Sequence, residues 1–458
     1  MSKYFGTDGI RGKANTGMMT PANILKVGQA IGVFLKQKYN EPKVIIGKDT
    51  RVSGYMVEGV LMAGLASVGV KVFYVGPIPT PGVAYLTRGM RADAGIMISA
   101  SHNPFHDNGI KIFDQDGYKL PDEQEEEIEA LVDSPSLEDY LAKPDEIGRA
   151  KRIDDAIGQY AVFLKERFPN DLKLDGMRIV LDCANGASYK VAPKVFKELG
   201  AEVFCIHDTP DGFNINRGSG ALHPEKLCTE VKKYRANVGF AFDGDADRLI
   251  AVDDNGQQLD GDQLIAICAN YMKEQKQLQN NRVCVTVMSN KGFDVAMEKA
   301  GIEVVRTKVG DRYVMEALRQ NAAILGGEQS GHLLFLDSNT TGDGVLAALK
   351  LLEVMIRKNQ SLSQLANIMK KYPQVLLNQK ITHKPPLEKL PNFLDTKRTQ
   401  EEILGNKGRV LVRYSGTEPL ARITVEGESL QQIEDMARQI ADSLESDISN
   451  FLNSSKQA

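Results

Sequence analysis

The first 110 residues place short apolar runs between segments with helical spacing. After Thr20-Pro21, a pair typical of a helix start, apolar residues recur at helical spacing at Ile24, Val27 and Ile31. A strand, a helix, a second strand and a further helix are then expected at residues 43–47, 53–68, 70–76 and 82–89. Strands that alternate with helices predict parallel strand pairs built from βαβ units.

The same order of elements occurs twice more along the chain. The expected strands of the second and third copies lie at residues 177–183, 201–208, 282–288 and 302–310. Each of the three copies ends in an apolar strand that runs directly into a polar, glycine-containing loop. Because ligands bind beyond the carboxyl ends of the strands in open α/β sheets, these three loops are expected to line one site.

The pattern changes after residue 370. Two strands joined by a loop are expected within residues 407–427, and a long amphipathic helix is expected at 429–446. The fold class is therefore predicted as α/β, with three α/β domains with mixed sheets followed by a C-terminal α+β domain. The predicted domains are residues 1–152, 153–254, 255–370 and 371–458. The acidic run at residues 122–129 is expected to be the solvated face of a helix.

Composition and charge limit the kinds of protein that the chain can be. Its 56 Lys and Arg residues face 60 Asp and Glu residues, and the resulting net charge of −4 argues against nucleic-acid binding through bulk positive charge. No run of about 18 apolar residues is present, so no membrane span is expected, and the polar residues of MSKYFGTDGIRG lead us to expect no secretory signal. The five cysteines are scattered and odd in number, which favours reduced thiols and a cytoplasmic location.

The first polar loop, ISASHNPFHDNGIKIF at residues 98–113, carries serine at the end of an apolar strand. A hydroxyl at such a position is fixed from behind and open in front, as a nucleophile or a phosphate carrier must be. The loop taken alone fits ordinary turn chemistry better. A hydrolase triad is not favoured, because the GxSxG elbow is absent.

The second polar loop, FAFDGDADR, places Asp243, Asp245 and Asp247 two residues apart between apolar runs. Three carboxylates in this position repel one another unless a cation neutralises them, and an all-oxygen site suits Mg²⁺ or Ca²⁺. The EF-hand alternative fails, because Arg248 and Asp254 stand where that motif needs Gly and Glu. Arg248 beside the cluster indicates a second anion, such as a phosphate.

Two further loops carry groups that suit a sugar phosphate. Glu328 and Ser330 in LGGEQSGH could grip vicinal sugar hydroxyls, although a glycine-rich turn with a polar tip explains this loop equally well. The loop RYSGTEPLAR offers hydroxyls, backbone N–H groups and two guanidinium groups, a collection that suits a phosphate dianion better than a plain hairpin tip does. The phosphate-binding candidates in this loop are Arg413, Ser415, Gly416, Thr417 and Arg422.

Taken together, ASHNP, DGDADR, GEQSGH and RxSGTEP resemble the α-D-phosphohexomutase family. They stand in the family's order, and the resemblance covers nearly the whole chain. It implies four domains around a deep central cleft. FGTDGIRG, TKVGDRYV and SGTEPLAR are most similar to bacterial members that act on glucosamine phosphates.

The resemblance gives the first two loops specific roles. It implies that Ser101 is the phosphoserine that gives and receives the phosphoryl group, and that Ser99 is a neighbour and not the carrier. It further implies that a phosphate oxygen on Ser101 joins Asp243, Asp245 and Asp247 in holding Mg²⁺.

The remaining roles also follow from the resemblance. Arg248 and Arg11 are expected to help neutralise the transferring phosphate. Lys111 and His102 are both candidates for the general base, with a slight preference for Lys111. Substrate contacts beyond those of the third and fourth loops are expected from Thr7, Asp8, Gly310 and Asp311.

The implied reaction interconverts glucosamine 6-phosphate and glucosamine 1-phosphate through a 1,6-bisphosphate intermediate. The implied cofactor is Mg²⁺, glucosamine or glucose 1,6-bisphosphate is expected as an activator, and relatives of this kind are often homodimers. Three alternatives stay open: a mutase for mannose or glucose phosphates, a silent phosphosugar-binding protein, and a Mg²⁺-dependent phosphatase. Where the glucosamine enzymes usually read Cys-Gly-Ser-Thr-His, this chain has Ser219, Ala221 and Leu222 at the Cys, Ser and Thr positions. These changes bear on local contacts between the second and third domains and on sugar preference.

Overall fold

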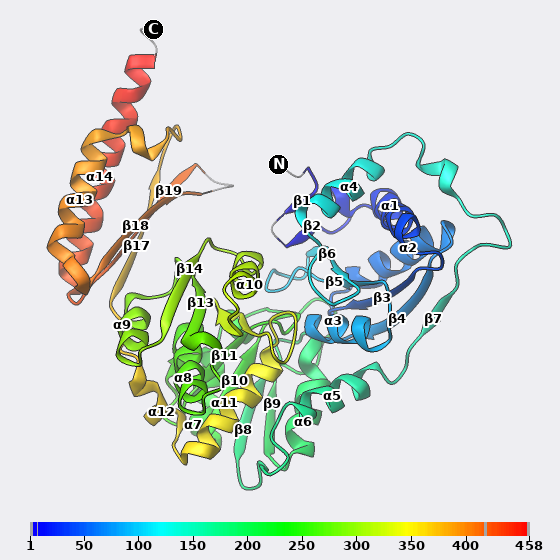
Figure 1. The fold of residues 1–458 in the computed structure, drawn as a ribbon, viewed down its shortest axis with the longest axis horizontal. Coiled ribbons are helices and arrows are strands. Elements are labelled where there is room, and N and C mark those ends of the chain that lie inside the picture. The colour runs from blue at the N-terminus through cyan, green and yellow to red at the C-terminus, as the bar shows by residue number, and fades with distance from the viewer. Residues whose placement is uncertain (1–2, 7, 416–418, 456–458) are drawn as a thin grey trace. The chain divides into compact units, whose positions relative to one another are not determined.

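The computed structural model describes residues 3–6, 8–415 and 419–455. The chain divides into two compact units, one of residues 1–288 with 301–368 and the other of residues 289–300 with 369–458. The first unit holds three α/β domains and the second is an α+β domain, so the predicted fold class is confirmed (Figure 1).

The first domain is built on a seven-stranded mixed sheet. Its strands are β1 (Phe5–Gly6), β2 (Gly9–Lys13), β3 (Lys43–Lys48), β4 (Lys71–Pro77), β5 (Ala94–Ile98), β6 (Asp107–Asp114) and β7 (Ala150–Arg152). The spatial order is β1-β2-β6-β5-β3-β4-β7. Strand β3 runs parallel to β4 and β5, as the βαβ pattern predicts, whereas β6 is antiparallel to β5 and β2.

Helices cover both faces of this sheet. They are α1 (Pro21–Lys38), α2 (Ser53–Ser67), α3 (Thr80–Gly89) and α4 (Asp122–Val132). Val44 and Ile46 of β3 belong to the core formed with α1 and α2. A Cβ on the neighbouring Gly47 would lie 2.4 Å from Val83 of α3, so alternate residues of β3 face opposite layers. Both faces are therefore buried, which explains the continuous apolar run of the strand.

The second and third domains repeat this architecture with smaller sheets. The second has the order β12-β11-β10-β8-β9 and the third has β14-β13-β15-β16, each with parallel pairs and an antiparallel edge. The strands are β8 (Arg178–Asp182), β9 (Glu202–Ile206), β10 (Val238–Phe242), β11 (Leu249–Val252), β12 (Gln258–Leu259), β13 (Arg282–Thr286), β14 (Glu303–Thr307), β15 (Leu325–Gly327) and β16 (Leu333–Phe335). The helices are α5 (Ala156–Glu166), α6 (Val191–Glu198), α7 (Glu225–Tyr234), α8 (Gly261–Glu274), α10 (Asp311–Gln320), α11 (Gly344–Lys358) and α12 (Leu362–Leu365).

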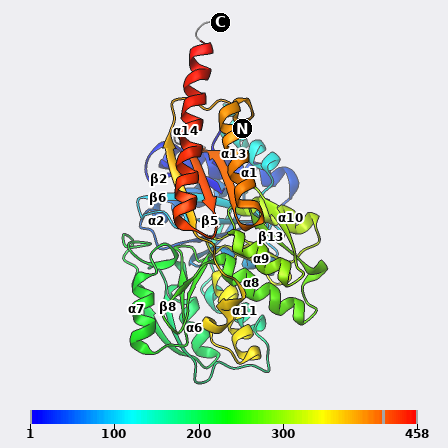
Figure 2. The ribbon, with the colours of Figure 1, turned by 90° about the vertical axis from the view of Figure 1, so that its left-hand side faces the viewer.

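The second unit consists of a three-stranded antiparallel sheet, ordered β17-β19-β18, with α13 and α14 on one face (Figures 1 and 2). Its elements are α9 (Lys291–Lys299), β17 (Gln374–Lys380), α13 (Pro391–Leu404), β18 (Arg409–Tyr414), β19 (Leu420–Glu426) and α14 (Leu430–Ser455). Helix α9 belongs to this unit, and the Lys291 N–H donates to Glu426 at 2.9 Å. The four predicted domain boundaries stay predictions.

Two expectations about helices are corrected. Helix α14 continues to Ser455 and does not end near residue 446, because buried apolar positions such as Ile448 extend its apolar stripe. The acidic helix is not simply a solvated face. Glu125 and Glu129 are buried, and Glu129 accepts backbone N–H groups near the start of the chain, including that of Phe5 at 2.7 Å.

No helix in the described part of the chain is both long enough and apolar enough to cross a membrane.

Candidate active site

Ser101 lies just beyond the carboxyl end of β5, at the edge where polar loops were expected. Its side chain is buried, its φ is 50°, and its backbone N–H donates to Ser99 Oγ at 2.8 Å. The Ser101 hydroxyl donates to Asp243 Oδ2 at 2.7 Å. Ser99 Oγ in turn donates to Asp49 at 2.7 Å. Of the two serines in this loop, only Ser101 therefore turns its hydroxyl toward the three-aspartate loop.

The backbone of the loop that carries Ser101 is held by hydrogen bonds from Arg51, a residue that the sequence analysis did not single out. Arg51 is fully buried and its Nε donates to Asp49 at 2.7 Å. Its terminal nitrogens donate to backbone carbonyls of Ser101, Asn103, Pro104 and Asp107. The usable signal was a pair of opposite charges at the carboxyl end of apolar β3, on the same edge as Ser101.

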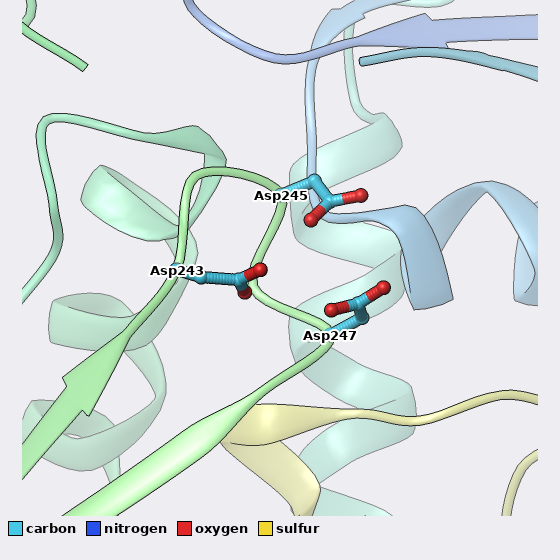
Figure 3. A group of neighbouring side chains, drawn as sticks. All are labelled: Asp243, Asp245 and Asp247. Atoms are coloured by element: carbon cyan, nitrogen blue, oxygen red, sulfur yellow. The ribbon is translucent and has the colours of Figure 1, made fainter. Parts of the chain in front are cut away.

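The predicted metal ligands converge on one point. Asp243, Asp245 and Asp247 lie in the loop between β10 and β11, are all buried, and offer carboxylate oxygens within 4.8 Å of one another (Figure 3). The loop packs tightly on the serine loop, because a Cβ on Gly244 would lie 2.5 Å from the Ser101 carbonyl oxygen. Glycine is therefore required between the first two aspartates.

This cluster fits a hard divalent cation. Asp245 Oδ1 and Asp247 Oδ1 are buried and have no hydrogen-bond partner among the described residues. Burial and the adjacent Asp247 and Asp245 raise the pKa of Asp243 well above its usual value, so three anions here require neutralisation. Carboxylate oxygens are the ligands that Mg²⁺ prefers, and the residues present therefore fit the predicted ion.

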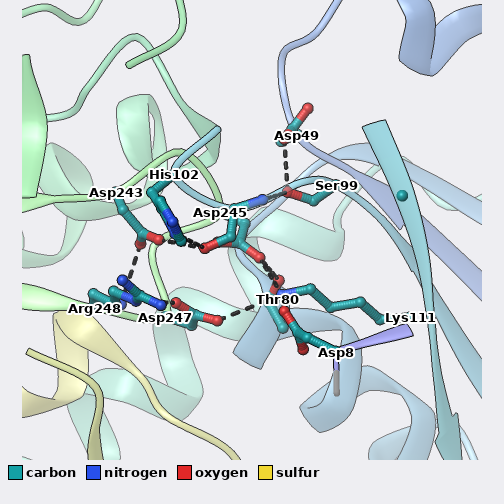
Figure 4. Close-up of polar contacts among 12 residues, drawn as sticks. Asp8, Asp49, Thr80, Ser99, His102, Lys111, Asp243, Asp245, Asp247 and Arg248 are labelled. Carbon is teal, nitrogen blue, oxygen red and sulfur yellow. Dashed lines mark hydrogen bonds and ion pairs between the residues drawn. The ribbon is translucent and has the colours of Figure 1, made fainter. Parts of the chain in front are cut away.

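Lys111 reaches the cluster from β6 of the first domain. It is buried, and its Nζ lies 2.9 Å from Asp245, 3.1 Å from Asp8 and 3.5 Å from Asp247 (Figure 4). Burial by itself lowers the pKa of Lys111, but the carboxylates of Asp245, Asp8 and Asp247 outweigh it and raise the pKa above its usual value. Thr80 Oγ1 also donates to Asp245 at 2.6 Å. In this geometry Lys111 is a cation that neutralises the cluster.

A second ionic network continues from Asp8. Arg11 and Lys119 both pair with Asp8, and Lys119 also pairs with Asp311 at the start of α10. The network thus joins the expected contacts Asp8, Arg11 and Asp311, and Lys119 is the residue that sequence reasoning missed. Thr7 lies outside the described residues.

His102 and Arg248 lie on either side of the carboxylates. His102 Nδ1 is 3.4 Å from Ser101 Oγ, and burial with the nearby Arg248 and Arg11 lowers the pKa of His102 to about 4. Arg248 Nε is 3.9 Å from Asp247 Oδ1. Both side chains thus lie where a phosphate on Ser101 would need them.

His332, the last residue of GEQSGH, was not singled out either. It is buried, neither ring nitrogen has a hydrogen-bond partner among the described residues, and Nε2 lies 3.9 Å from Asp311 and 4.0 Å from Asp247. It therefore lies between the carboxylate loop and α10.

The sugar loop, LGGEQSGH at residues 325–332, is hydrogen-bonded to the residue that precedes α10. The Gly310 N–H donates to Glu328 Oε1 at 3.2 Å, and Ser330 is exposed at the tip of the loop. Glu328 thus lies beside Gly310 and the first residue of α10, Asp311.

In the second unit, Arg413 and Arg422 are direct partners across β18 and β19. Two guanidinium groups opposite each other repel unless an anion lies between them; burial and Arg422 lower the pKa of Arg413. Ser415 is buried beside them, and its N–H donates to Leu420 at 2.8 Å. Gly416 and Thr417 lie outside the described residues.

A buried serine hydroxyl beside three carboxylates that could hold a cation, with lysine and arginine side chains around them, is typical of phosphoryl-transfer enzymes. The particular family follows from comparison with known proteins. Residues 2–139, 159–256 and 260–372 match the phosphoglucomutase/phosphomannomutase alpha/beta/alpha domains I, II and III, and residues 376–443 match the C-terminal domain. The chain belongs to the phosphoglucomutase/phosphomannomutase family of isomerases, the α-D-phosphohexomutases.

Similar proteins cover nearly the whole chain. The phosphoglucosamine mutase of Geobacter metallireducens is 52% identical over 448 residues, which are 98% of this chain and 99% of that protein. A phosphoglucomutase/phosphomannomutase family protein from Burkholderia thailandensis has the same fold, with a TM-score of 0.80, 24% identity and 98% of both chains covered. The N-acetylphosphoglucosamine mutase of Aspergillus fumigatus, solved with GlcNAc-6P and magnesium, has a TM-score of 0.66 and 17% identity, covering 98% of this chain and 96% of that one.

Proposed function

We propose that the chain interconverts glucosamine 6-phosphate and glucosamine 1-phosphate through a phosphorylated Ser101. The observation that carries the proposal is the 2.7 Å hydrogen bond from Ser101 Oγ to Asp243 within the three-carboxylate cluster. The similarity to phosphoglucosamine mutases supports the choice of sugar. A mutase for mannose or glucose phosphates is the second candidate, because the same machinery suits those sugars.

The reaction consists of two phosphoryl transfers in opposite directions. The bond between Ser101 Oγ and phosphorus breaks while the sugar's 1-hydroxyl forms a new bond to phosphorus and gives its proton to a base. The resulting 1,6-bisphosphate then turns end for end. Its 6-phosphate passes back to the serine oxygen, the sugar's O6 takes up a proton, and glucosamine 1-phosphate leaves. Such transfers depend mainly on in-line positioning and charge neutralisation.

The residues around Ser101 supply both requirements. Arg248 and Arg11 neutralise the negative charge of the transferring phosphate. Lys111 neutralises the carboxylates of Asp8 and Asp245. Mg²⁺ held by the three aspartates would supply additional positive charge at the transferring phosphate. The sequence analysis left two candidates for the general base, His102 and Lys111. The carboxylates that raise the pKa of Lys111 keep it protonated, so we assign the base to His102, whose Nδ1 lies 3.4 Å from Ser101 Oγ.

Substrate binding is assigned to the other two loops. Glu328 and Ser330 bind sugar hydroxyls, with Gly310 and Asp311 behind them. The phosphate that is not reacting is bound by Arg413, Ser415, Gly416, Thr417 and Arg422. Thr7 and Asp8 are assigned further contacts with the substrate. The cross-strand pair of arginines supports this assignment.

Three further expectations belong to the same proposal. Glucosamine or glucose 1,6-bisphosphate acts as an activator by phosphorylating Ser101. The protein is a homodimer and is located in the cytoplasm, in keeping with its five free cysteines.

A comparison of sugars tests the proposed substrate. With Mg²⁺ and a bisphosphate primer, kcat/KM for glucosamine 6-phosphate is expected to exceed the values for glucose and mannose 6-phosphates by at least about a hundredfold, because a site built to bind an amino group rejects a hydroxyl there. Comparable values for glucose or mannose would leave the mechanism standing and reject the glucosamine assignment.

A further inference from the structure

Two side chains from different domains bind the same two carbonyl groups of the serine loop. Arg51 of the first domain donates to the Ser101 and Asn103 carbonyl oxygens at 2.9 and 2.8 Å. The Nδ2 group of Asn216, from the second domain, donates to the same two oxygens at 2.8 and 3.0 Å. The backbone of the loop at Ser101 is therefore hydrogen-bonded to side chains of two different domains.

The Asn216 side chain also packs against the carboxylate loop. A Cβ on Gly244 would lie 2.5 Å from the Ser101 carbonyl oxygen and 2.7 Å from Asn216 Nδ2. Both atoms of the hydrogen bond between Asn216 and Ser101 therefore pack against Gly244, the residue between Asp243 and Asp245. Three segments that are far apart in sequence meet at this bond.

The backbone of Asn216 suits this task. Its φ is 59°, a left-handed conformation that asparagine adopts more readily than most residues, and its N–H donates to the Ala184 carbonyl at 2.9 Å. The residue precedes Ser219, where the chain departs from the usual wording of the glucosamine enzymes. Sequence reasoning gave Asn216 no role.

We propose that Asn216, together with Arg51, is a positioning residue that holds Ser101 Oγ at hydrogen-bonding distance from Asp243 during phosphoryl transfer. Arg51 fixes the loop to its own domain, and Asn216 fixes it to the domain that carries the carboxylates. The inference rests on the proposed role of Ser101 as phosphate carrier and does not depend on which sugar is the substrate. Neither side chain contacts the reacting atoms, so the effect is on alignment.

The half-reaction with glucose 1,6-bisphosphate isolates this effect. In it the P–O bond to the sugar breaks, a P–O bond to Ser101 forms, and the serine proton is lost while the sugar oxygen gains one. Mass spectrometry of quenched samples follows the gain of one phosphate per chain with Mg²⁺ in excess. The rate constant reports alignment in each folded molecule, whereas the amplitude reports the fraction of folded molecules.

Two substitutions at position 216 keep its backbone conformation accessible. Asn216→Gly tolerates the positive φ and removes the amide; Asn216→Asp keeps the shape and replaces the donor with a carboxylate that faces two carbonyl oxygens. Asn214→Asp is the matched control, because Asn214 lies in the same segment and, among the described residues, its hydrogen bonds go to that segment and to Asn185. Arg51→Lys keeps the positive charge but cannot make the five hydrogen bonds of the guanidinium group.

Both substitutions at Asn216 are expected to lower the rate constant at least about tenfold, with KM for the bisphosphate within about twofold of wild type and Asn214→Asp unchanged. Arg51→Lys is expected to lower the same rate constant. Rate constants within about twofold of wild type at position 216, or a loss confined to the amplitude, would overturn the proposal. If wild type phosphorylates Ser101 but does not turn over glucosamine 6-phosphate, only the proposed sugar fails.

Discussion

At the scale of single residues, the candidate site depends on where a common side chain is placed. Ser101 differs from Ser99 not in chemistry but in surroundings. The Ser99 hydroxyl donates to Asp49 and accepts a hydrogen bond from the Ser101 N–H. The Ser101 hydroxyl donates to Asp243. Ser101 also differs in its backbone, because its φ of 50° lies in the left-handed region.

Replacing the proposed carrier tests this placement. Ser101→Ala is expected to lower kcat by at least about a thousandfold, because no other described hydroxyl donates to the aspartate cluster at Asp243. Thermal unfolding should stay close to wild type, since the substitution removes only the hydroxyl contacts with Asp243 and His102. Ser99→Ala, measured in parallel, should still accept a phosphate. Substantial mutase activity in Ser101→Ala would place the carrier elsewhere.

Single residues also show where sequence reasoning ends. The spacing of Asp243, Asp245 and Asp247 between two apolar runs favoured convergence of their carboxylates on a cation over a solvated acidic turn, and the structure places the three carboxylates close together. Arg51 and Asn216 could not be found this way. Their roles arise from contacts about 50 and 115 positions away in the chain. The opposite charges at the end of β3 mark Arg51 as a polar residue at the right edge, but no local pattern shows which distant groups Arg51 and Asn216 contact.

At the scale of elements, the site is made by loops that leave strands at the same edge. The serine loop follows β5, the carboxylate loop follows β10, and the sugar loop follows β15. The alternation of strands and helices predicted these positions. It did not predict how closely the loops pack, which depends on glycines such as Gly244 that admit a neighbouring backbone.

The carboxylate loop should make stability respond to metal. Mg²⁺ at about a hundred times its dissociation constant is expected to raise the free energy of unfolding by about 2–3 kcal/mol, because only the folded chain assembles the three ligands. Asp247→Asn should lose this increase and be at least as stable as wild type in EDTA, since one of three crowded charges is gone. Scanning calorimetry with and without Mg²⁺ measures both effects.

Asp254→Asn is the control for this experiment, because Asp254 is exposed and follows β11, outside the cluster. It should keep the full response to Mg²⁺. An Asp247→Asn protein that is stabilised as much as wild type would mean that the cation binds elsewhere.

At the scale of the whole molecule, the chain combines three copies of one architecture with a different C-terminal unit. The repeated pattern of strands, helices and polar loops predicted the three sheets, and the change of pattern after residue 370 predicted the fourth domain. The inclusion of α9 in the second unit was not foreseen, because Lys291 and Glu426 are 135 positions apart in sequence. Periodicity indicates what an element is and not which distant element it joins.

The proposed function assigns a separate task to each unit. The first unit holds the phosphate carrier, the cation site and the sugar loop, and the second carries the cross-strand arginines for the phosphate that is not reacting. In the proposed reaction the bisphosphate turns end for end, so its two phosphates exchange roles. The phosphate on the serine should therefore end up on the sugar, and the sugar's own phosphate should end up on the serine.

Tracing a labelled phosphate tests this claim most directly. Protein carrying radioactive phosphate on Ser101 is mixed with unlabelled glucosamine 6-phosphate and Mg²⁺, and the products are separated after one turnover. The account predicts that the label leaves in glucosamine 1-phosphate while Ser101 regains an unlabelled phosphate. Release of the label as inorganic phosphate, or its retention on the protein while product forms, would contradict it.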